Sequence, residues 1–400
     1  MLIGIVGAPN CGKSTLFKAL TLASDVYIAN FPFATIKPNH GAAFVSFPCV
    51  DTFFETQCNP RTGFCRHHTR FVPVDVVDVA GLVPGAHKGE GMGLEFLNDL
   101  NQADMLIQVI DISGSTNIKG EPVAAGSFDP KAFVLFLQEE LDQWYVLILR
   151  KVWDKFAKTV AQTHRDPVKE VAKQFSGLGV TEQIAKDAFA AIHLGERRLN
   201  EITEEELLSF ARFLRIASKP MVIAANKIDV PGAVDNLERL RKEFPDLEFF
   251  SVSAESELAL KEADKAKLIE YVPGENKFSF IAKEQLSEKQ LAALDFVQKN
   301  ILEKNKGTGV QQLMNAAVFN VLKRIAIYPG GVNKLADSDG NILPDCFLLK
   351  DQATALDFAY KLHTDFGKNF IRAIDVKTKR TVGKDHLLHH QDVVEIVAGK

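Results

Sequence analysis

The first residues that could do chemistry stand near the start of the chain, where Gly7–Ser14 reads G-A-P-N-C-G-K-S. This spacing fits the phosphate-loop pattern G-x-x-x-x-G-K-[ST], in which backbone N–H groups and a helix N-terminus surround a polyphosphate. Lys13 would bring positive charge to the β- and γ-phosphates, and Ser14 would offer its hydroxyl to Mg²⁺. We therefore predict a nucleoside triphosphate site. The candidate nucleotide-binding residues of this loop are Asn10, Cys11, Gly12, Lys13, Ser14 and Thr15.

Two further segments are candidates for the γ-phosphate end of the same site. Asp78 ends an apolar run, and a carboxylate at the carboxyl end of a strand can hold Mg²⁺ through water. Gly81 has no side chain, so its N–H can approach the γ-phosphate closely. Thr35, in the segment Asn30–Thr35, can complete the Mg²⁺ ligands. The predicted magnesium residues are thus Ser14, Thr35 and Asp78.

A third segment, Asn226–Asp229, reads N-K-I-D and is typical of guanine recognition. The Asp229 carboxylate can accept hydrogen bonds from the N1–H and the exocyclic amino group of guanine. Adenine offers no such pair of donors. The stem of Lys227 can lie along the base, and a backbone N–H at Ser253 or Ala254 can reach the guanine O6. The candidate base-binding residues are Asn226, Lys227, Asp229, Ser253 and Ala254.

Short apolar runs rich in β-branched residues must position these motifs. Such runs predict strands over residues 2–6, 74–79, 105–111, 221–225 and 247–252, and the apolar spacing of residues 13–21 predicts a helix. Strands that alternate with helices favour an α/β fold with a mostly parallel sheet. We therefore predict a P-loop NTPase domain in which each motif follows the carboxyl end of a strand.

The spacing of the strands also predicts how the chain divides into domains. Residues 1–128 and 220–325 are expected to form a discontinuous P-loop GTPase domain, and residues 129–219 a helical insertion. Within the insertion, Thr203 and Glu206 have the spacing of a capping box. Residues 326–400 are expected to form a small α+β module with strands at 347–349, 371–376 and 393–397 and a helix at 354–362.

Composition excludes several classes of protein. The 400 residues are 46% hydrophobic and 24% charged, and 47 basic against 51 acidic residues give a net charge of −4. That balance excludes a strongly basic histone-like protein and an acidic disordered tail. No run of 18 apolar residues predicts a membrane span, and the first residues do not resemble a signal peptide. Five cysteines do not make a secreted disulfide framework. We expect a cytoplasmic monomer.

Taken together, the motifs resemble the YchF-type GTPases of the Obg group of translation-factor-related P-loop GTPases. The resemblance rests on the phosphate loop, on Asn30–Thr35, and on residues 78–93, which read D-V-A-G-L-V-P-G-A-H-K-G-E-G-M-G. Residues 343–344, 359–365 and 391–397 are similar to a TGS domain, so the resemblance covers essentially the whole chain. It implies GTP or GDP as ligand, Mg²⁺ as cofactor, and the ribosome or RNA as partner, without a membrane.

The resemblance also implies a catalytic arrangement. Leu82 stands where many small GTPases carry a water-orienting glutamine. His87 is then expected to position water, and Lys13 to act with it as a catalytic residue. A loop histidine without chemistry is the alternative for His87. As a second route, Asn10 can ligate K⁺ beside the β- and γ-phosphates.

Two departures from the family pattern stand out. The best-known members have a base motif that ends in Glu and accept ATP, whereas this chain has Asp229, which favours GTP. In addition, the segment Phe47–Phe71 is unusually long and holds three cysteines, two histidines and several arginines. Its cysteine intervals of eight and six residues differ from the paired spacing of most structural zinc sites. A zinc site formed by Cys49, Cys58, Cys65, His67 and His68 is therefore the weaker hypothesis for this segment. The alternatives are a loop of reduced thiols and a basic surface for phosphate backbones.

We interpret the chain as a GTP-binding and GTP-hydrolysing molecular switch associated with ribosomes or translation. An ATPase of the same fold is the first alternative. The second is a nucleotide-gated module that binds RNA or ribosomes and hydrolyses nucleotide only incidentally. The helical insertion and the C-terminal module are the candidate partner surfaces.

Overall fold

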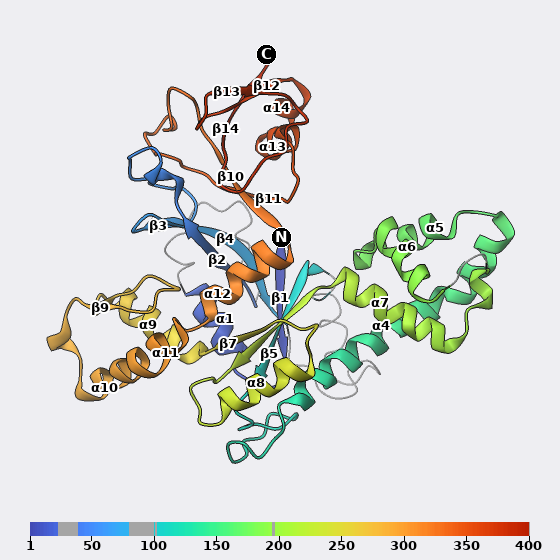
Figure 1. Ribbon diagram of the computed structural model, residues 1–400, viewed down its shortest axis with the longest axis horizontal. Coiled ribbons are helices and arrows are strands. Elements are labelled where there is room, and N and C mark those ends of the chain that lie inside the picture. The colour runs from blue at the N-terminus through green and yellow to red at the C-terminus, as the bar shows by residue number, and fades with distance from the viewer. Residues whose placement is uncertain (23–38, 80–99, 101, 194–196, 400) are drawn as a thin grey trace. The chain divides into compact units, whose positions relative to one another are not determined.

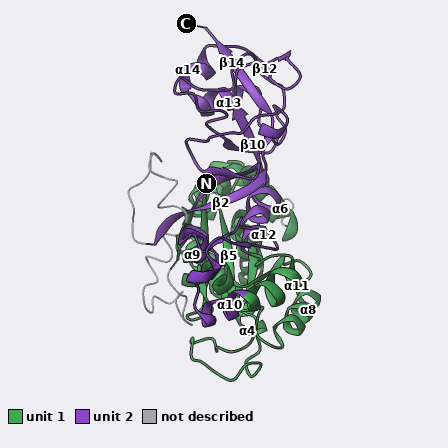
Figure 2. Cartoon of the chain, turned by 90° about the vertical axis from the view of Figure 1, so that its left-hand side faces the viewer, with its two compact units in different colours: residues 1–19, 76–258, 295–309 green, residues 20–75, 259–294, 310–400 purple. Residues whose placement is uncertain are grey.

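The computed structural model describes residues 1–22, 39–79, 100, 102–193 and 197–399 (Figure 1). Within these residues the chain forms two compact units, coloured separately in Figure 2. Unit 1 comprises residues 1–19, 76–258 and 295–309, and unit 2 comprises residues 20–75, 259–294 and 310–400. No helix among the described residues is both long enough and apolar enough to cross a membrane.

Unit 1 is built on four parallel strands that lie in the order β1, β5, β6, β7. Their bounds are Leu2–Gly7 for β1, Met105–Asp111 for β5, Met221–Asn226 for β6 and Phe249–Val252 for β7. β5 is buried throughout, which explains its nearly continuous apolar sequence. These strands agree with the predicted α/β fold and its mostly parallel sheet.

The helices of unit 1 follow the strands, and the longest of them belongs to the predicted insertion. The bounds are α1 Lys13–Thr21, α4 Lys131–Thr163, α5 Pro167–Gln174, α6 Glu182–Ala191, α7 Glu204–Ser218, α8 Ala233–Glu243 and α11 Glu303–Asn305, with short helical turns η3 Ser176–Leu178, η4 Leu199–Glu201 and η6 Gln298–Leu302. α4 to α7 lie together in Figure 1, and they pack around an aromatic core that includes Trp153 and Phe210. Thr203 and Glu206 form the predicted capping box of α7.

The C-terminal part of unit 2 is a five-stranded sheet in the order β11, β10, β14, β12, β13. Its strands are β10 Arg324–Pro329, β11 Phe347–Lys350, β12 Phe370–Asp375, β13 Arg380–Val382 and β14 Val393–Ala398, with helices α13 Ala355–Leu362 and α14 Thr364–Lys368. Phe358 of α13 is fully buried in the core of this sheet. The predicted α+β module is therefore confirmed as a fold, and it contains two strands that were not predicted, β10 and β13.

The remainder of unit 2 contains the unusual segment around the cysteines. Its elements are β2 His40–Pro48, η1 Val50–Thr52, β3 Phe64–Arg66, β8 Ile269–Glu270, β9 Ser279–Phe280, η5 Lys283–Gln285, α12 Val310–Asn315 and η7 Ala316–Val321. Three further elements have residues in both units, namely β4 Thr69–Asp78, α9 Ala254–Lys265 and α10 Glu288–Val297. β3 pairs with β4 as an antiparallel hairpin. Phe64 stacks on Phe71 across this pairing, and Phe44 of β2 packs edge-on against Phe64. The segment is a packed β structure.

The sheet of unit 1 explains where the motifs must meet. In parallel strands the carboxyl ends lie at one edge, which is where ligands bind in open α/β sheets. Gly7, Asp111, Asn226 and Val252 end their strands at this edge, and Asp111 lies directly beside Asn226 in the register. The phosphate loop and the N-K-I-D segment leave the sheet from this edge.

Candidate functional site

The phosphate loop connects β1 to α1, as its sequence predicts. Gly12 has a φ of 95°, and a Cβ built on it would lie 2.0 Å from the side-chain nitrogen of Asn226. Only glycine fits there, since both the backbone conformation and the contact exclude a side chain. Lys13 is the first residue of α1, and Ser14 and Thr15 follow in its first turn. The loop therefore presents Lys13 and Ser14 at a helix N-terminus, as anion binding requires.

Lys13, Ser14 and Asp78 come together in unit 1. The Lys13 ammonium forms an ion pair with Asp78 Oδ1 at 2.6 Å, and Ser14 Oγ donates a hydrogen bond to Asp78 Oδ2 at 3.3 Å. The lysine and aspartate side chains are only 12% and 13% exposed. A triphosphate with Mg²⁺ would supply both groups with stronger partners, since phosphate oxygens attract the ammonium and the cation attracts the carboxylate. The three residues are therefore grouped as a magnesium-triphosphate site needs.

Asn226 holds two loops of the site together. Its side-chain N–H₂ donates to the carbonyl of Cys11 at 3.0 Å, and its side-chain oxygen accepts the N–H of Ala254 at 3.0 Å. Asn226 is 3% exposed, so these bonds are shielded from water. A buried amide with both ends satisfied fixes its partners firmly. This residue thus positions the phosphate loop relative to the segment after β7.

Lys227 is oriented by a residue that the sequence analysis did not single out, Asp111 at the end of β5. The Lys227 ammonium donates to Asp111 Oδ2 at 2.8 Å and to Ser115 Oγ at 3.3 Å. Asp111 is fully buried. Although burial opposes its ionisation, hydrogen bonds from Lys227, Ser113, Thr116 and Ser115 hold the pKa of Asp111 below its ordinary value. A carboxylate at a strand's carboxyl end was the signal that could have revealed it.

Asp229 is exposed to solvent, and Ser253 sets its orientation. Ser253 Oγ lies 2.8 Å from both Asp229 Oδ1 and Ser256 Oγ. A hydrogen bond to one carboxylate oxygen fixes the plane of the group before a ligand arrives. The predicted donors to the guanine O6 already have protein partners, because the Ser253 N–H bonds to the Thr308 carbonyl and the Ala254 N–H bonds to Asn226. A role in contacting O6 would require Ala254 to exchange its Asn226 partner for the base.

Two residues of the phosphate loop have other contacts. Asn10 has a φ of 60° and donates from its side-chain nitrogen to the Gly120 carbonyl at 2.8 Å. This leaves the side-chain oxygen as the atom that could face a cation. Cys11 is fully buried and donates to the Ala8 carbonyl, and burial raises the pKa of its thiol to about 12. The thiol therefore stays protonated, and Cys11 contributes to the loop through its backbone.

The structure brings together most of the predicted residues, and three lie outside the described residues. These three are Thr35, Gly81 and His87. Their predicted roles in Mg²⁺ binding, γ-phosphate contact and water positioning rest on the sequence.

Three family models match the chain. A 50S ribosome-binding GTPase model matches residues 2–149, and a model described as Obg-like GTPase YGR210-like, G4 motif-containing domain matches residues 224–331. A TGS domain model matches residues 338–398.

Relatives and solved structures agree with these models along the whole chain. A GTP-binding protein of Methanocaldococcus jannaschii is 47% identical, and the match covers 99% of each chain. The ribosome-binding ATPase YchF of Bacillus subtilis is 27% identical over 92% of this chain and 87% of its own. The crystal structure of a GTP binding protein from Pyrococcus horikoshii OT3 matches with 35% identity, a TM-score of 0.78 and full coverage of both chains.

Proposed function

Because the chain belongs to the YchF-type GTPases of the Obg group and carries a C-terminal TGS domain, we propose that it is a guanine-specific switch that works on the ribosome. The observation that carries the base assignment is the Asp229 carboxylate, which Ser253 orients at the carboxyl edge of the sheet. A carboxylate held in one plane can accept both donors of guanine at once. An experiment that tests the proposal measures GTP hydrolysis with and without ribosomes. Hydrolysis that ribosomes do not stimulate would contradict a ribosomal switch.

At the phosphate end, each residue has a distinct proposed role. Lys13 would leave Asp78 and contact the β- and γ-phosphates, where negative charge develops during hydrolysis. Ser14 would ligate Mg²⁺ directly and Asp78 through water, with Thr35 closing the shell. When bound, Mg²⁺ would neutralise part of the negative charge on the phosphates. Gly81 would sense the γ-phosphate, so that its segment and that of Thr35 relax when the γ-phosphate is lost.

His87 is proposed from the sequence as the residue that orients the attacking water. His87→Ala is expected to lower GTP turnover by roughly 10- to 100-fold, because positioned side chains contribute effects near this size. The affinity for GTP should stay unchanged, since the residue is not expected to touch the nucleotide before reaction. Single-turnover hydrolysis and titration of a GDP analogue separate the two quantities. Equal turnover of variant and parent in K⁺ buffer would assign the role to Asn10 and a bound K⁺ instead.

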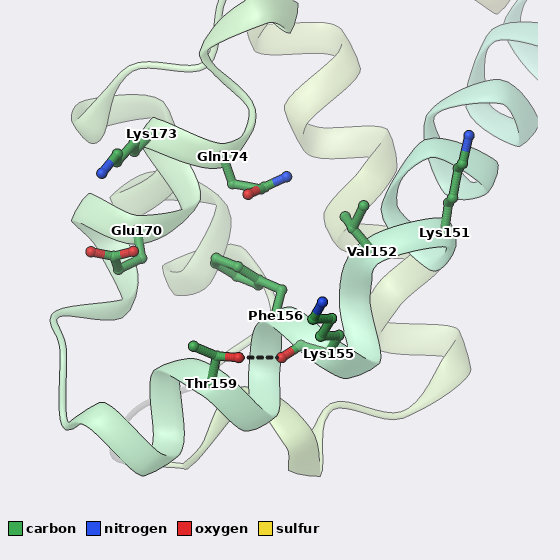
Figure 3. Close-up of a pocket in the computed structure, with 8 residues that line it drawn as sticks. All are labelled: Lys151, Val152, Lys155, Phe156, Thr159, Glu170, Lys173 and Gln174. Atoms are coloured by element: carbon green, nitrogen blue, oxygen red, sulfur yellow. Dashed lines mark hydrogen bonds between the residues drawn. The ribbon is translucent and has the colours of Figure 1, made fainter.

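A basic hollow on the helical insertion is a candidate surface for ribosomal RNA. Its volume is about 530 Å³, and Lys151, Lys155 and Lys173 line it together with Phe156 and a single acidic residue, Glu170 (Figure 3). The three lysines are exposed on α4 and α5. Clustered ammonium groups bind the phosphate backbone of nucleic acid with strong salt dependence. The hollow therefore supports the proposal that the insertion contacts RNA.

Changing Lys151, Lys155 and Lys173 together to Glu should weaken ribosome binding by at least about tenfold and flatten its salt dependence. The expected reason is the loss of cationic contacts to phosphates. A matched control changes three exposed lysines of the same unit, Lys186, Lys242 and Lys299, to Glu, which alters net charge equally. Co-sedimentation with ribosomes at several salt concentrations gives the measurement. Equal weakening by both triple variants would show that net charge, and not this hollow, determines binding.

The alternative is an ATPase of the same fold, the activity that appears in the name of the Bacillus subtilis relative, a ribosome-binding ATPase. The residue that separates the two functions is Asp229. A preference for ATP in direct competition would replace the guanine assignment, whereas the phosphate-end roles would remain.

The proposed division of labour follows the predicted domains. Residues 1–128 and 220–325 would bind and hydrolyse the nucleotide, residues 129–219 would contact RNA, and the TGS-like residues 326–400 would provide a second partner surface. We propose that the chain acts in the cytoplasm as a monomer, which size-exclusion chromatography with light scattering can test.

A further inference from the structure

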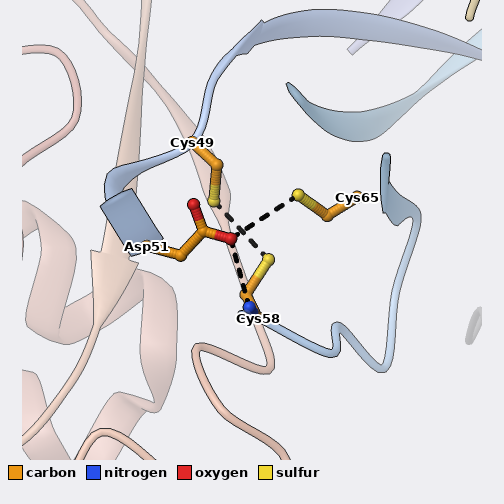
Figure 4. Close-up of side chains that lie close together, drawn as sticks. All are labelled: Cys49, Asp51, Cys58 and Cys65. Carbon is orange, nitrogen blue, oxygen red and sulfur yellow. Dashed lines mark hydrogen bonds between the residues drawn. The ribbon is translucent and has the colours of Figure 1, made fainter. Parts of the chain in front are cut away.

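Three cysteines and an aspartate of unit 2 converge on one point, although eight and six residues separate the cysteines. Cys49 follows β2, Asp51 lies in η1, Cys58 lies in the next loop and Cys65 lies on β3. Their four potential ligand atoms all lie within 4.8 Å of one another, and Figure 4 shows the side chains pointing inward. Cys49, Asp51 and Cys58 are buried, and Cys65 is half-buried. We propose that Cys49, Asp51, Cys58 and Cys65 form a structural zinc site.

The distances fit one tetrahedral ion. Zinc–sulfur bonds of about 2.3 Å place two sulfurs of a tetrahedron about 3.8 Å apart. The Sγ atoms of Cys49 and Cys58 are 3.5 Å apart, and Cys65 Sγ lies 3.8 Å from Asp51 Oδ2. A sulfur-rich closed set of four ligands selects zinc over magnesium or calcium, which prefer six or more oxygens. An iron–sulfur cluster would hold its cysteine sulfurs further apart than this set does.

The surroundings orient the carboxylate as a metal ligand needs. Asp51 is fully buried, and its Oδ1 lies 3.0 Å from Nδ1 of His68. Its Oδ2 accepts the Cys58 N–H at 3.1 Å and faces the sulfurs. A partner on one carboxylate oxygen leaves the other aimed at the ion, which is how outer hydrogen bonds orient metal ligands. His68 would thus fix Asp51 and would not itself bind zinc.

The positive charge of a neighbouring residue, Arg70, also fits a cluster of negatively charged metal ligands. Arg70 is fully buried, and within the described residues it forms no ion pair with a carboxylate. Its Nη1 lies 3.7 Å from Cys58 Sγ and its guanidinium also donates to the carbonyls of Leu343 and Pro344. A buried cation needs a negative partner. Three thiolates, a carboxylate and Zn²⁺ carry −4 + 2 = −2, which Arg70 partly neutralises.

The proposed zinc would fix the loop after Cys58, which is hydrogen-bonded to the C-terminal module. Directly after Cys58, the Asn59 N–H bonds to the Ile342 carbonyl at 3.1 Å and the Arg61 N–H to the Pro344 carbonyl at 3.0 Å. Arg61 also forms an ion pair with Asp345. Because a metal that joins four points of a short segment removes most of its freedom, loss of zinc should loosen this attachment. The site is separate from the residues assigned to nucleotide binding.

The first test is the metal content of the full-length protein, purified without chelator and measured by mass spectrometry of the elements. We expect close to one zinc per chain. Cys49→Ser and Cys58→Ser should hold below about a tenth of that amount, because each removes a ligand. Cys346→Ser, which changes a cysteine outside the set, should retain the zinc. Iron in place of zinc, no metal in the parent protein, or equal loss in the Cys346→Ser variant would each overturn the proposal.

The second test uses the parent protein, so it does not depend on whether the cysteine variants fold. The chain is stripped with a chelator and titrated with Co²⁺. A tetrahedral site should give intense visible bands and a thiolate-to-cobalt absorption in the near ultraviolet, which one equivalent of Zn²⁺ abolishes. Weak octahedral bands would contradict the site. So would an intact mass showing that Cys49 and Cys58 form a disulfide in the freshly purified protein.

Discussion

Lys13→Ala is expected to lower GTP turnover by about 100- to 1,000-fold, the range found when one preorganised charge-stabilising group is removed. In the structure the Lys13 ammonium is nearly buried and pairs with Asp78, so it is already placed beside the predicted magnesium residues. Removing it eliminates the one cation that the loop itself would direct at the β- and γ-phosphates. Single-turnover hydrolysis at saturating GTP measures the effect on the chemical step.

The matched control is Lys18→Ala, which removes an exposed lysine from the same helix. It should leave both turnover and affinity unchanged. Circular dichroism and the affinity for GDP show whether the Lys13→Ala variant is folded. Turnover and affinity equal to those of the parent would remove the phosphate-loop assignment.

Asp229→Asn is expected to weaken GTP binding by at least about 100-fold, because a hydrogen bond to a charged group is worth about 1.5–3 kcal/mol and two are affected. The amide retains one acceptor but presents a donor to the amino group of guanine. Binding of xanthosine triphosphate should increase, since xanthine has an acceptor at that position. The gain is more diagnostic than the loss, because damage to the fold cannot produce it.

Asp235→Asn serves as the control for this substitution, because Asp235 is an exposed aspartate on the adjacent helix α8. Asp235→Asn should leave the binding of both GTP and xanthosine triphosphate unchanged. Ser253→Ala should reduce GTP affinity less than Asp229→Asn does, since it removes only the hydrogen bond that orients Oδ1. If Asp229→Asn still prefers GTP over xanthosine triphosphate as strongly as the parent does, Asp229 does not contact the base.

The motifs could be predicted because their chemistry depends on short spacings. Gly12, Lys13 and Ser14 adjoin one another, and the strand-to-helix context of their loop is visible as a change of hydrophobic period. The roles of Asn226 and Asp111 could not be predicted in the same way. Asn226 bonds to Cys11, 215 positions away, and Asp111 reaches Lys227 only because β5 and β6 pair in register. Such contacts depend on the sheet order, which no local pattern contains.

The cysteine segment shows the same limitation more strongly. Its intervals differ from the paired spacing of common zinc motifs, so the sequence favoured a loop of reduced thiols over a metal site. The hairpin of β3 and β4 returns Cys65 toward Cys58, and η1 turns Asp51 inward between them. Tertiary structure, and not spacing, creates this ligand set. Similarly, β13 escaped prediction because three residues are too few for a clear period, and β10 because it lies across the predicted domain boundary at residue 326.

Competition binding to the unmodified chain shows whether its nucleotide site, with Asp229 as the base-binding residue, selects guanine. A fluorescent GDP analogue is bound first and then displaced by unlabelled GTP, GDP, ATP or ADP in the presence of Mg²⁺. GTP is expected to displace the analogue at a concentration at least about 100-fold below that of ATP. Displacement by ATP at the same concentration as GTP would contradict the guanine assignment and establish the ATPase alternative.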